Sequence, residues 1–186
     1  QQATFGGVIA AGLAGPARIS AGNLRDFVLG TRLMDGRGED LSFGGKVMKN
    51  VAGYDVSRLL PGSLGTLALL LEASVKVLPK PAATASLRCT ITQDRALRIL
   101  NEWAGQPLPL NSSAWIGKTN EEGQLTVRLA GANAAVATAS KMMAAELSAT
   151  LMDFTDAVTF WNELREQAHV WFKELAPGNA LWRLSL

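Results

Sequence analysis

Cysteine and histidine are nearly absent from this chain of 186 residues, which contains one of each, Cys89 and His169. A single cysteine excludes an internal disulfide and any multi-cysteine zinc or iron–sulfur site, and a single histidine excludes most histidine-rich metal sites. We therefore expect no metal centre in the chain and a reducing compartment around it. Because neither residue lies in a recognisable catalytic pattern, we interpret Cys89 as a small buried thiol and His169 as a structural or surface side chain.

An excess of charge of one sign is also missing, as is any long hydrophobic run. Lys and Arg total 18 against 16 for Asp and Glu, a net charge of +2, which gives no electrostatic reason to expect nucleic acid as a partner. The longest apolar runs, such as Leu67 to Leu71, fall far short of the roughly 18 residues that a membrane span needs. The N-terminus shows no basic and then apolar signal pattern and begins with Gln1, so we expect a soluble chain that is either processed or a fragment.

Two common nucleotide-binding motifs are missing as well. The sequence has no Walker A loop, and Gly36-Arg37-Gly38 lacks the third glycine and the following helix of a dinucleotide fingerprint. A Rossmann-type site is therefore not expected. The tryptophans are scattered without a helical period, apart from Trp161 and Trp171, so we interpret them as packing residues and not as a stacking platform.

The composition is globular, with 48% apolar and 18% charged residues, but it changes near Pro79-Lys80-Pro81. Of the 18 glycines, 13 lie in residues 1–81, and all 5 tryptophans follow that segment. Each proline removes a backbone donor and disfavours a helix before it, which indicates an extended connector. We therefore predict two domains, residues 1–81 and residues 82–186.

Turn residues and apolar patterns predict antiparallel strands and one short helix in the first half. Asp35-Gly36-Arg37-Gly38 favours a tight hairpin turn, and Asp55 is a candidate N-cap for the helix. The predicted elements are strands over Phe27 to Met34, Asp40 to Phe43 and Leu67 to Leu78, and a helix over Val56 to Leu60.

The second half predicts the order strand, helix, strand, strand, helix, which begins a ferredoxin-like layout. A further helix and a final strand follow, so the fold class is α+β. The buried face of the first helix is expected to carry Ala96, Leu97, Leu100, Trp103 and Ala104. The predicted elements are strands over Leu87 to Thr92, Ser113 to Gly117, Gln124 to Leu129 and Leu181 to Leu186, and helices over Asp94 to Ala104, Ala134 to about Thr150 and Thr155 to Glu174.

Glycine and other small residues gather in three clusters of the first half. Small residues let backbone amides approach a large planar or phosphorylated ligand, and consecutive amides form concavities that bind anions. The clusters indicate either a cofactor cradle or a set of turns, and composition alone weighs the two equally. The clusters are Thr4 to Gly15, Lys49 to Asp55 and Gly62 to Leu67.

These clusters also resemble a known family. The resemblance rests on Ala3-Thr4-Phe5-Gly6-Gly7 through Gly15-Pro16, Arg25 to Gly30, Gly44 to Asp55, and Gly62 to Leu67, with weaker support from Gln106 to Pro109, Trp161 to Gln167 and Leu181 to Arg183. Together they resemble the FAD-binding subunits of bacterial glycolate oxidases, of the vanillyl-alcohol-oxidase or PCMH type. In that family two α/β lobes hold an extended FAD, and a cap with a ferredoxin-like sheet covers the flavin ring. The resemblance implies that residues 1–81 are the second lobe and residues 82–186 a truncated cap.

The resemblance implies cofactor contacts made mostly by backbone atoms. The Gly6-Gly7 segment would pass near the flavin, Gly53-Tyr54 would lie against the edge of the ring, and Leu69 and Leu70 would offer backbone groups to its pyrimidine side. The full set of implied FAD-binding residues is Thr4, Gly6, Gly7, Gly12, Asn50, Gly53, Tyr54, Gly62, Gly65, Leu69 and Leu70.

The chain departs from the family pattern at two positions. Leu64 stands where many relatives have an acid, and Ala68 stands where glycine is common; backbone contacts stay possible at both. No catalytic base can be named. Arg25, Lys49 and Arg58 are candidates for pairing a carboxylate or a phosphate, although each is more often a solvated or structural charge.

The function implied by the resemblance is oxidation of a 2-hydroxy acid, glycolate to glyoxylate, with hydride passing to FAD and electrons onward to an iron–sulfur subunit. The implied partners are the flavin and iron–sulfur subunits of the complex. The implied location of the protein is the cytoplasm, with any contact to the inner membrane made through that complex. Two alternatives stay open. One is another flavin enzyme of this fold, such as a D-lactate dehydrogenase or a reductase of cell-wall precursors, and the other is a non-catalytic flavin-binding or assembly subunit.

The family's upstream lobe, with its pyrophosphate loop, has no counterpart before Gln1, and the end of the cap is missing after Leu186. We therefore expect a middle fragment with an incomplete FAD site that binds FAD weakly or not at all. The apolar run Leu67 to Leu71 is the expected face of a homodimer, since a missing lobe would otherwise cover it.

Overall fold

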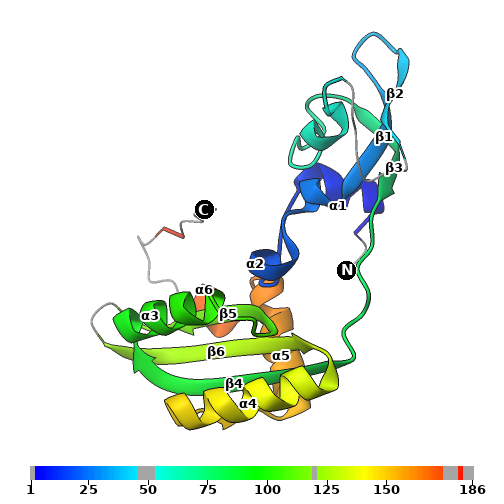
Figure 1. Ribbon diagram of the computed structural model, residues 1–186. Coiled ribbons are helices and arrows are strands. Elements are labelled where there is room, and N and C mark those ends of the chain that lie inside the picture. Colours follow the sequence, from blue (N-terminus) through cyan, green and yellow to red (C-terminus); the bar gives the residue numbers. More distant parts are fainter. Residues whose placement is uncertain (1–2, 46–52, 119–120, 174–179, 182–186) are drawn as a thin grey trace. The chain divides into compact units, whose positions relative to one another are not determined.

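The computed structural model describes residues 3–45, 53–118, 121–173 and 180–181 of the chain (Figure 1). Contacts divide the chain into two compact units, of which unit 1 comprises Gln1–Ala14 and Ala21–Lys80. Unit 2 comprises Gly15–Ser20 and Pro81–Leu186. The division after Lys80 falls in the proline-rich connector, and the short segment Gly15–Ser20 packs with residues that are distant from it in the sequence.

Unit 1 is built on a three-stranded sheet. Its elements are α1 (Phe5–Ala11), η1 (Leu24–Asp26), β1 (Val28–Met34), β2 (Asp40–Gly44), η2 (Val56–Leu59) and β3 (Leu69–Val75), while α2 (Arg18–Ala21) crosses between the units. The strand order is β2-β1-β3, and both pairings are antiparallel. The buried apolar side chains, which hold α1 and η2 against this sheet, are Ile9, Val28, Leu33 and Leu60.

The predicted hairpin is confirmed, and its turn is organised by Asp35. The Asp35 carboxylate accepts hydrogen bonds from the N–H groups of Arg37 and Glu39 at 2.8 and 2.9 Å. Gly38 has a φ of 81°, a conformation that is unfavourable for a residue with a side chain. The turn residues therefore act locally, as their sequence predicts.

Asp55 does not cap a helix in the predicted way. The segment after it, η2, is a 3₁₀ helix that ends at Leu59, and the Asp55 side chain accepts no backbone capping bond. Its carboxylate instead accepts a hydrogen bond from the Ser57 hydroxyl at 2.7 Å and forms an ion pair with Arg58, with Nε and Oδ2 2.9 Å apart. Because two side-chain donors satisfy the carboxylate, the first-turn amides are not its partners.

Unit 2 confirms the predicted order of strand, helix, strand, strand, helix, and with it the α+β class. Its elements are β4 (Ala83–Thr92), α3 (Gln93–Ala104), β5 (Leu110–Ile116), β6 (Glu122–Gly131), α4 (Asn133–Leu147), β7 (Thr150–Leu151), α5 (Phe154–Arg165) and α6 (Val170–Lys173). The sheet is antiparallel, in the order β5-β6-β4-β7.

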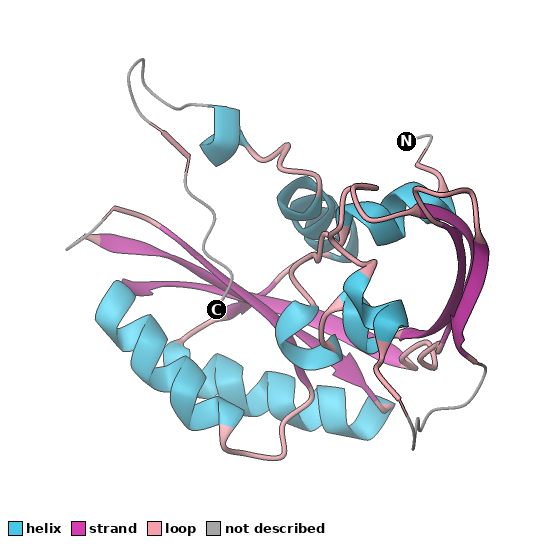
Figure 2. Ribbon diagram, turned by 90° about the horizontal axis from the view of Figure 1, so that it is seen from above, coloured by secondary structure: helices cyan, strands magenta, loops and turns pink. Residues whose placement is uncertain are grey.

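The main core lies between this sheet and the helices α3 and α4, which run along one of its faces (Figure 2). The helix α3 buries Ala96, Ile99 and Trp103. The prediction for Leu97 was wrong, because its side chain is 54% exposed, and Ala104 is exposed as well. Leu97 lies about 160° around the helix from the buried Ile99, because each helical residue turns by about 100°, so its side chain faces away from the sheet.

The long helices of unit 2 end earlier than predicted. The helix α4 stops at Leu147, because Ser148 takes a left-handed φ of 51° and its N–H donates to the Ala144 carbonyl. The single helix predicted over Thr155 to Glu174 is divided into α5 and α6, with Gln167 between them at a φ of 54°. Glu174 and most of the strand predicted over Leu181 to Leu186 lie outside the described residues.

Candidate cofactor-binding site

The first glycine cluster forms the short helix α1 and its caps. Thr4 is the N-cap, and its hydroxyl accepts a hydrogen bond from the N–H of Gly7 at 3.1 Å. A Cβ on Gly6 would have no heavy atom of the described residues within 4 Å, so these residues leave the space beside this first-turn position open. The helix ends at Gly12, which has a left-handed φ of 60°. Thr4 and Gly12 therefore shape α1, while Gly6 leaves its surface open.

The third cluster packs its backbone against the end of α1. The N–H of Gly62 donates to the Ile9 carbonyl at 3.2 Å, and the N–H of Leu64 donates to the Ala10 carbonyl at 2.9 Å. A Cβ on Gly12 would lie only 2.5 Å from the Gly62 nitrogen, so a larger residue does not fit there. The structure thus brings the first and third glycine clusters together within unit 1.

Gly53, Gly62 and Gly65 form a different class of glycine. Their φ angles are 80°, 85° and 77°, so their backbone conformation favours glycine. A Cβ on any of the three would have no heavy atom within 4 Å. The described residues leave the space beside these positions open. Another molecule can therefore approach the backbone closely at all three.

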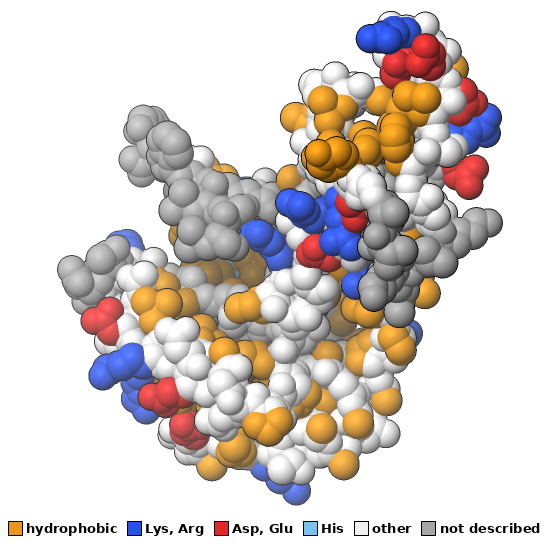
Figure 3. Space-filling view, turned by 45° about the horizontal axis from the view of Figure 1, so that its top comes forward, with side chains coloured by type: hydrophobic (Ala, Val, Ile, Leu, Met, Phe, Trp, Pro, Cys, Tyr) orange, Lys and Arg blue, Asp and Glu red, His pale blue; other side chains and the backbone are white. Residues whose placement is uncertain are grey.

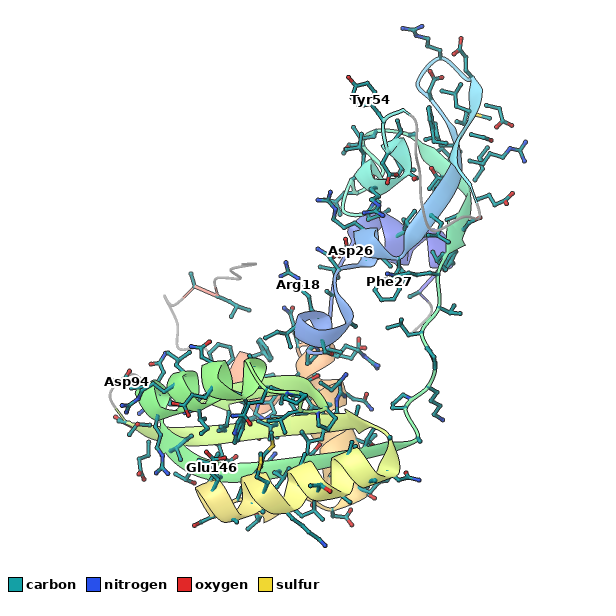
Figure 4. The ribbon with its side chains drawn as sticks, viewed as in Figure 1. Arg18, Asp26, Phe27, Tyr54, Asp94 and Glu146 are labelled. Atoms are coloured by element: carbon teal, nitrogen blue, oxygen red, sulfur yellow. The ribbon has the colours of Figure 1, made fainter. Side chains whose placement is uncertain are left out.

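Large apolar side chains next to these glycines are uncovered. Tyr54 is 95% exposed and Leu64 is 74% exposed. Figure 4 shows Tyr54 on the loop before η2, and Figure 3 shows hydrophobic side chains grouped on the surface of unit 1. Leu64 also holds a φ of 53°, a conformation that costs a non-glycine residue about 1 kcal/mol. Grouped apolar exposure of this kind is typical of a surface that another molecule or another part of the protein covers.

Leu69 and Leu70 stand at the start of β3, at the edge of the sheet. Among the described strands, β3 pairs only with β1, so its second edge presents backbone N–H and C=O groups without a strand partner. The side chain of Leu69 is 63% exposed and that of Leu70 is half-buried. The backbone groups of Leu69 and Leu70 on this edge are therefore accessible to a ligand, as the resemblance implies.

A tight contact that the sequence reasoning missed joins the ends of β1 and β2. A Cβ on Gly30 would lie 2.6 Å from the nitrogen of Gly45, so the two strands approach at a point where only glycine fits. Gly30 also faces Gly44 in the strand register. The signal was present in the sequence, because pairing Met34 with Asp40 across the turn sets Gly30 opposite Gly44. At Gly30 and Gly44 the close backbone contact by itself requires glycine.

Few charged side chains anchor this site. Arg58, one of the three candidate cations, is already paired with Asp55. Arg25 lies in η1 and takes part in none of the ion pairs found among the described residues. Lys49 and Asn50 lie outside the described residues. The described site is therefore made of backbone and apolar surface, with Arg25 as its one candidate cation left without an ion pair in that part of the chain.

Cys89 and His169 show packing roles. Burial raises the pKa of the Cys89 thiol, which keeps it protonated and unreactive. The His169 ring contacts the edge of Phe160, with the ring centroids 5.6 Å apart. Within the described residues no group of three or more His, Cys, Asp or Glu side chains could hold a metal ion. No helix in that part of the chain has both the length and the apolarity to cross a bilayer.

The FAD implied by the resemblance fits part of this surface. Glycines whose Cβ positions are open allow a flat ring to approach the backbone, and exposed apolar side chains can cover such a ring. The residues that fit are Gly6, Gly53, Gly62 and Gly65, with Tyr54 and Leu64 beside them. Gly12 belongs to the chain's own packing instead.

The amino-acid sequence is also similar to those of known proteins. No protein-family model matches the chain. Over all 186 residues the chain is 45% identical to glycolate oxidase subunit GlcE of Escherichia coli (strain K12) and spans 49% of that protein. Over its whole length the chain is therefore similar to a glycolate oxidase subunit. The family resemblance stated from the motifs is thereby confirmed.

Two further comparisons agree with this relationship. The chain is 42% identical over 84 residues to glycolate oxidase subunit GlcD of Bacillus subtilis (strain 168), a match covering 45% of the chain and 18% of that protein. It matches a solved structure of alkyldihydroxyacetonephosphate synthase with a TM-score of 0.64 and 15% identity, over 86% of the chain and 36% of that structure. At such low identity the second match shows the fold alone. The chain spans about half the length of GlcE and less of these other proteins.

Proposed function

We propose that this chain is part of the FAD-binding subunit of a glycolate oxidase, which oxidises glycolate to glyoxylate and passes electrons to an iron–sulfur subunit. The observation that carries the proposal is the set of positive-φ glycines, Gly53, Gly62 and Gly65, with open space at their Cβ positions. The identity to GlcE over the whole chain supports it independently. In this proposal unit 1 is the second lobe of the FAD-binding domain, and unit 2 is the cap.

When bound, FAD would accept the hydride of the 2-hydroxy acid, since the redox chemistry belongs to the cofactor. The chain's own residues would bind and orient it. The backbone at Gly53, Gly62 and Gly65 would lie against the ring system, and Tyr54 and Leu64 would cover it and exclude water. The free edge of β3 at Leu69 and Leu70 would offer N–H and C=O groups. No described side chain is assigned as a base.

A second candidate is a related FAD-linked dehydrogenase for another 2-hydroxy acid. The chain is 32% identical over 111 residues to a D-lactate dehydrogenase of Archaeoglobus fulgidus, which supports this class, although that match spans only 25% of the relative. A third candidate is a non-catalytic subunit that binds flavin or a partner. The scarcity of histidine favours that reading, because histidine is the most frequent general base.

The test uses the protein that carries this sequence, purified with its partner subunits. The molar ratio of flavin to protein, measured by absorbance, should be close to one. Gly53→Val should reduce this ratio several-fold, because the valine side chain would occupy the space proposed for the flavin ring. Gly38→Val is the matched control, since Gly38 also has a positive φ and open space but lies in the β1–β2 turn. Equal flavin loss in both variants, or full occupancy in Gly53→Val, would overturn the cradle.

Substrate and partners are separated in the same preparation. Dye reduction driven by glycolate and not by D-lactate is expected for a glycolate oxidase, and the reverse preference would favour the second candidate. An iron–sulfur subunit that copurifies and is reduced by glycolate would support the proposed electron route. Flavin binding without any reduction of dye would favour the non-catalytic subunit. Fractionation should place the complex in the cytoplasm, with any membrane contact made through partner subunits.

A further inference from the structure

A cavity of about 770 Å³ lies in unit 2, on the face of the sheet opposite the core. Its volume is in the range of small-molecule sites. The apolar part of its wall is formed by Leu151, Phe154, Val158 and Trp161. The indole N–H of Trp161 donates to the Ser86 hydroxyl at 2.9 Å, which fixes α5 on this face of the sheet. The cavity is therefore built from a strand framework and a helix that is tied to it.

Arg128 of β6 enters the same cavity as a partly buried cation. Its Nε donates to the Asn111 side-chain oxygen at 2.7 Å, and its Nη2 donates to the Ser112 hydroxyl at 2.9 Å. The guanidinium lies over the Trp161 ring, 5.0 Å from its centroid. An arginine has five N–H groups, so these two bonds leave most of its donors for another partner.

The charge of Arg128 is not neutralised within the described residues. None of the ion pairs found there involves it, and burial lowers its pKa, because the charged form loses solvation. A partly buried cation without a carboxylate is costly unless a ligand supplies one. Neutral hydrogen-bond acceptors and a stacked ring hold Arg128 in place. They also fix the direction in which a carboxylate can meet it.

The rest of the cavity indicates what kind of anion fits. Asp153 also lines the cavity. Hydrogen bonds from backbone N–H groups at the start of α5, the strongest of them from Thr155, lower the pKa of the Asp153 carboxyl and keep it charged. One cation and one anion in the wall favour a monoanion over a phosphate dianion. A two-carbon acid would fill only a small fraction of 770 Å³. The apolar wall is suited to a carbon skeleton larger than that of glycolate.

We propose that this cavity binds an organic monocarboxylate with an apolar or aromatic tail, its carboxylate paired with Arg128 and its tail lying against Trp161, Phe154 and Val158. The inference goes beyond the proposed function, because it uses unit 2 alone and needs no flavin.

The test is calorimetric titration of the chain with phenylacetate, in the absence of flavin. Saturable one-to-one binding is expected. Phenylacetamide, which has the same shape without the charge, should bind at least about tenfold more weakly, and so should inorganic phosphate. Because these comparisons use the unaltered chain, they do not depend on how a variant folds. Equal affinity for acid and amide, tighter binding of phosphate, or no saturation below about 10 mM would overturn the proposal.

Variants locate the site. Arg128→Met should weaken phenylacetate binding by about tenfold or more, since it keeps the aliphatic stem and removes the charge. Arg88→Met is the matched control. The Arg88 guanidinium carbon lies over the ring of Phe160, the neighbour of Trp161 in α5, at 4.9 Å from the ring centroid, but Arg88 is not part of the cavity wall. Circular dichroism checks that both variants are folded. If Arg88→Met weakens binding as much as Arg128→Met, the assignment to Arg128 is wrong. The flavin assay contains no carboxylic acid, so the two proposals fail separately.

Discussion

The backbones of Gly12 and Gly62 are in direct contact, so that a Cβ on Gly12 would lie 2.5 Å from the Gly62 nitrogen. The two residues belong to different glycine clusters, and the contact fixes the end of α1 against the turn before β3. Gly62 itself faces open space in the direction of its own missing Cβ. The two glycines of one contact therefore have different roles, one in packing and one at the candidate site.

Gly12→Ala should destabilise unit 1 by about 3 kcal/mol, because it combines a backbone clash with a left-handed conformation. Gly62→Ala should cost about 1 to 2 kcal/mol, since only the conformation is disfavoured. Urea unfolding followed by circular dichroism measures both. If Gly12→Ala is no less stable than Gly62→Ala, the close contact between α1 and the turn is not present in solution.

Trp103→Ala should lower the stability of unit 2 by about 3 to 5 kcal/mol, because it empties a large volume between α3, α4 and the sheet. Trp103 is 1% exposed, and its indole N–H donates to the Glu146 carboxylate at 3.1 Å. Glu146→Met removes the acceptor at this exposed position and should change stability by about 1 kcal/mol or less. Thermal unfolding separates the two variants. A similar loss in both would mean that the hydrogen bond, and not the ring volume, stabilises the core.

Cys89 should make the folded state less stable at high pH. Burial raises the pKa of its thiol, so the folded chain keeps the proton where the unfolded chain has lost it. The favourable contribution is complete below about pH 8.5, the pKa of a free thiol, and is lost as the pH rises from there through the folded-state pKa. Urea midpoints between about pH 7.5 and 9.5 should fall more for the unaltered chain than for Cys89→Ala.

The reactivity of the same thiol gives an independent check. Ellman's reagent should label Cys89 in the native chain far more slowly than in urea, because the buried thiol is neither exposed nor ionised. Labelling of the native chain at the rate of the unfolded one would contradict the burial.

The chain should self-associate through the exposed leucines at the start of β3, where Leu67 and Leu69 are 57% and 63% exposed. Apolar surface on a sheet edge favours pairing with a second copy. Leu69→Lys should shift the chain toward monomer in light scattering at micromolar concentration. Leu97→Lys, at a leucine of unit 2 that is 54% exposed, should leave the association unchanged. A monomer mass for the unaltered chain across a tenfold dilution would exclude this dimer.

What the sequence predicted correctly depends on neighbours along the chain. The turn at residues 35–38 follows from local hydrogen bonds of Asp35 and the conformational freedom of Gly38. The order of strands and helices in unit 2 follows from apolar periodicity, and the family motifs are themselves short runs of sequence. Such local interactions can be predicted from the sequence, because the residues that interact lie within a few positions of one another in the chain.

Tertiary structure decided the roles of individual residues. Sequence alone placed Gly12, Gly53 and Gly62 in one class, and only the fold separates the glycine that packs from those that face open space. Arg128 carried no signal in the sequence, because its neighbours in the cavity come from β5 and α5. These roles depend on distances between distant segments, which no local pattern of residues encodes.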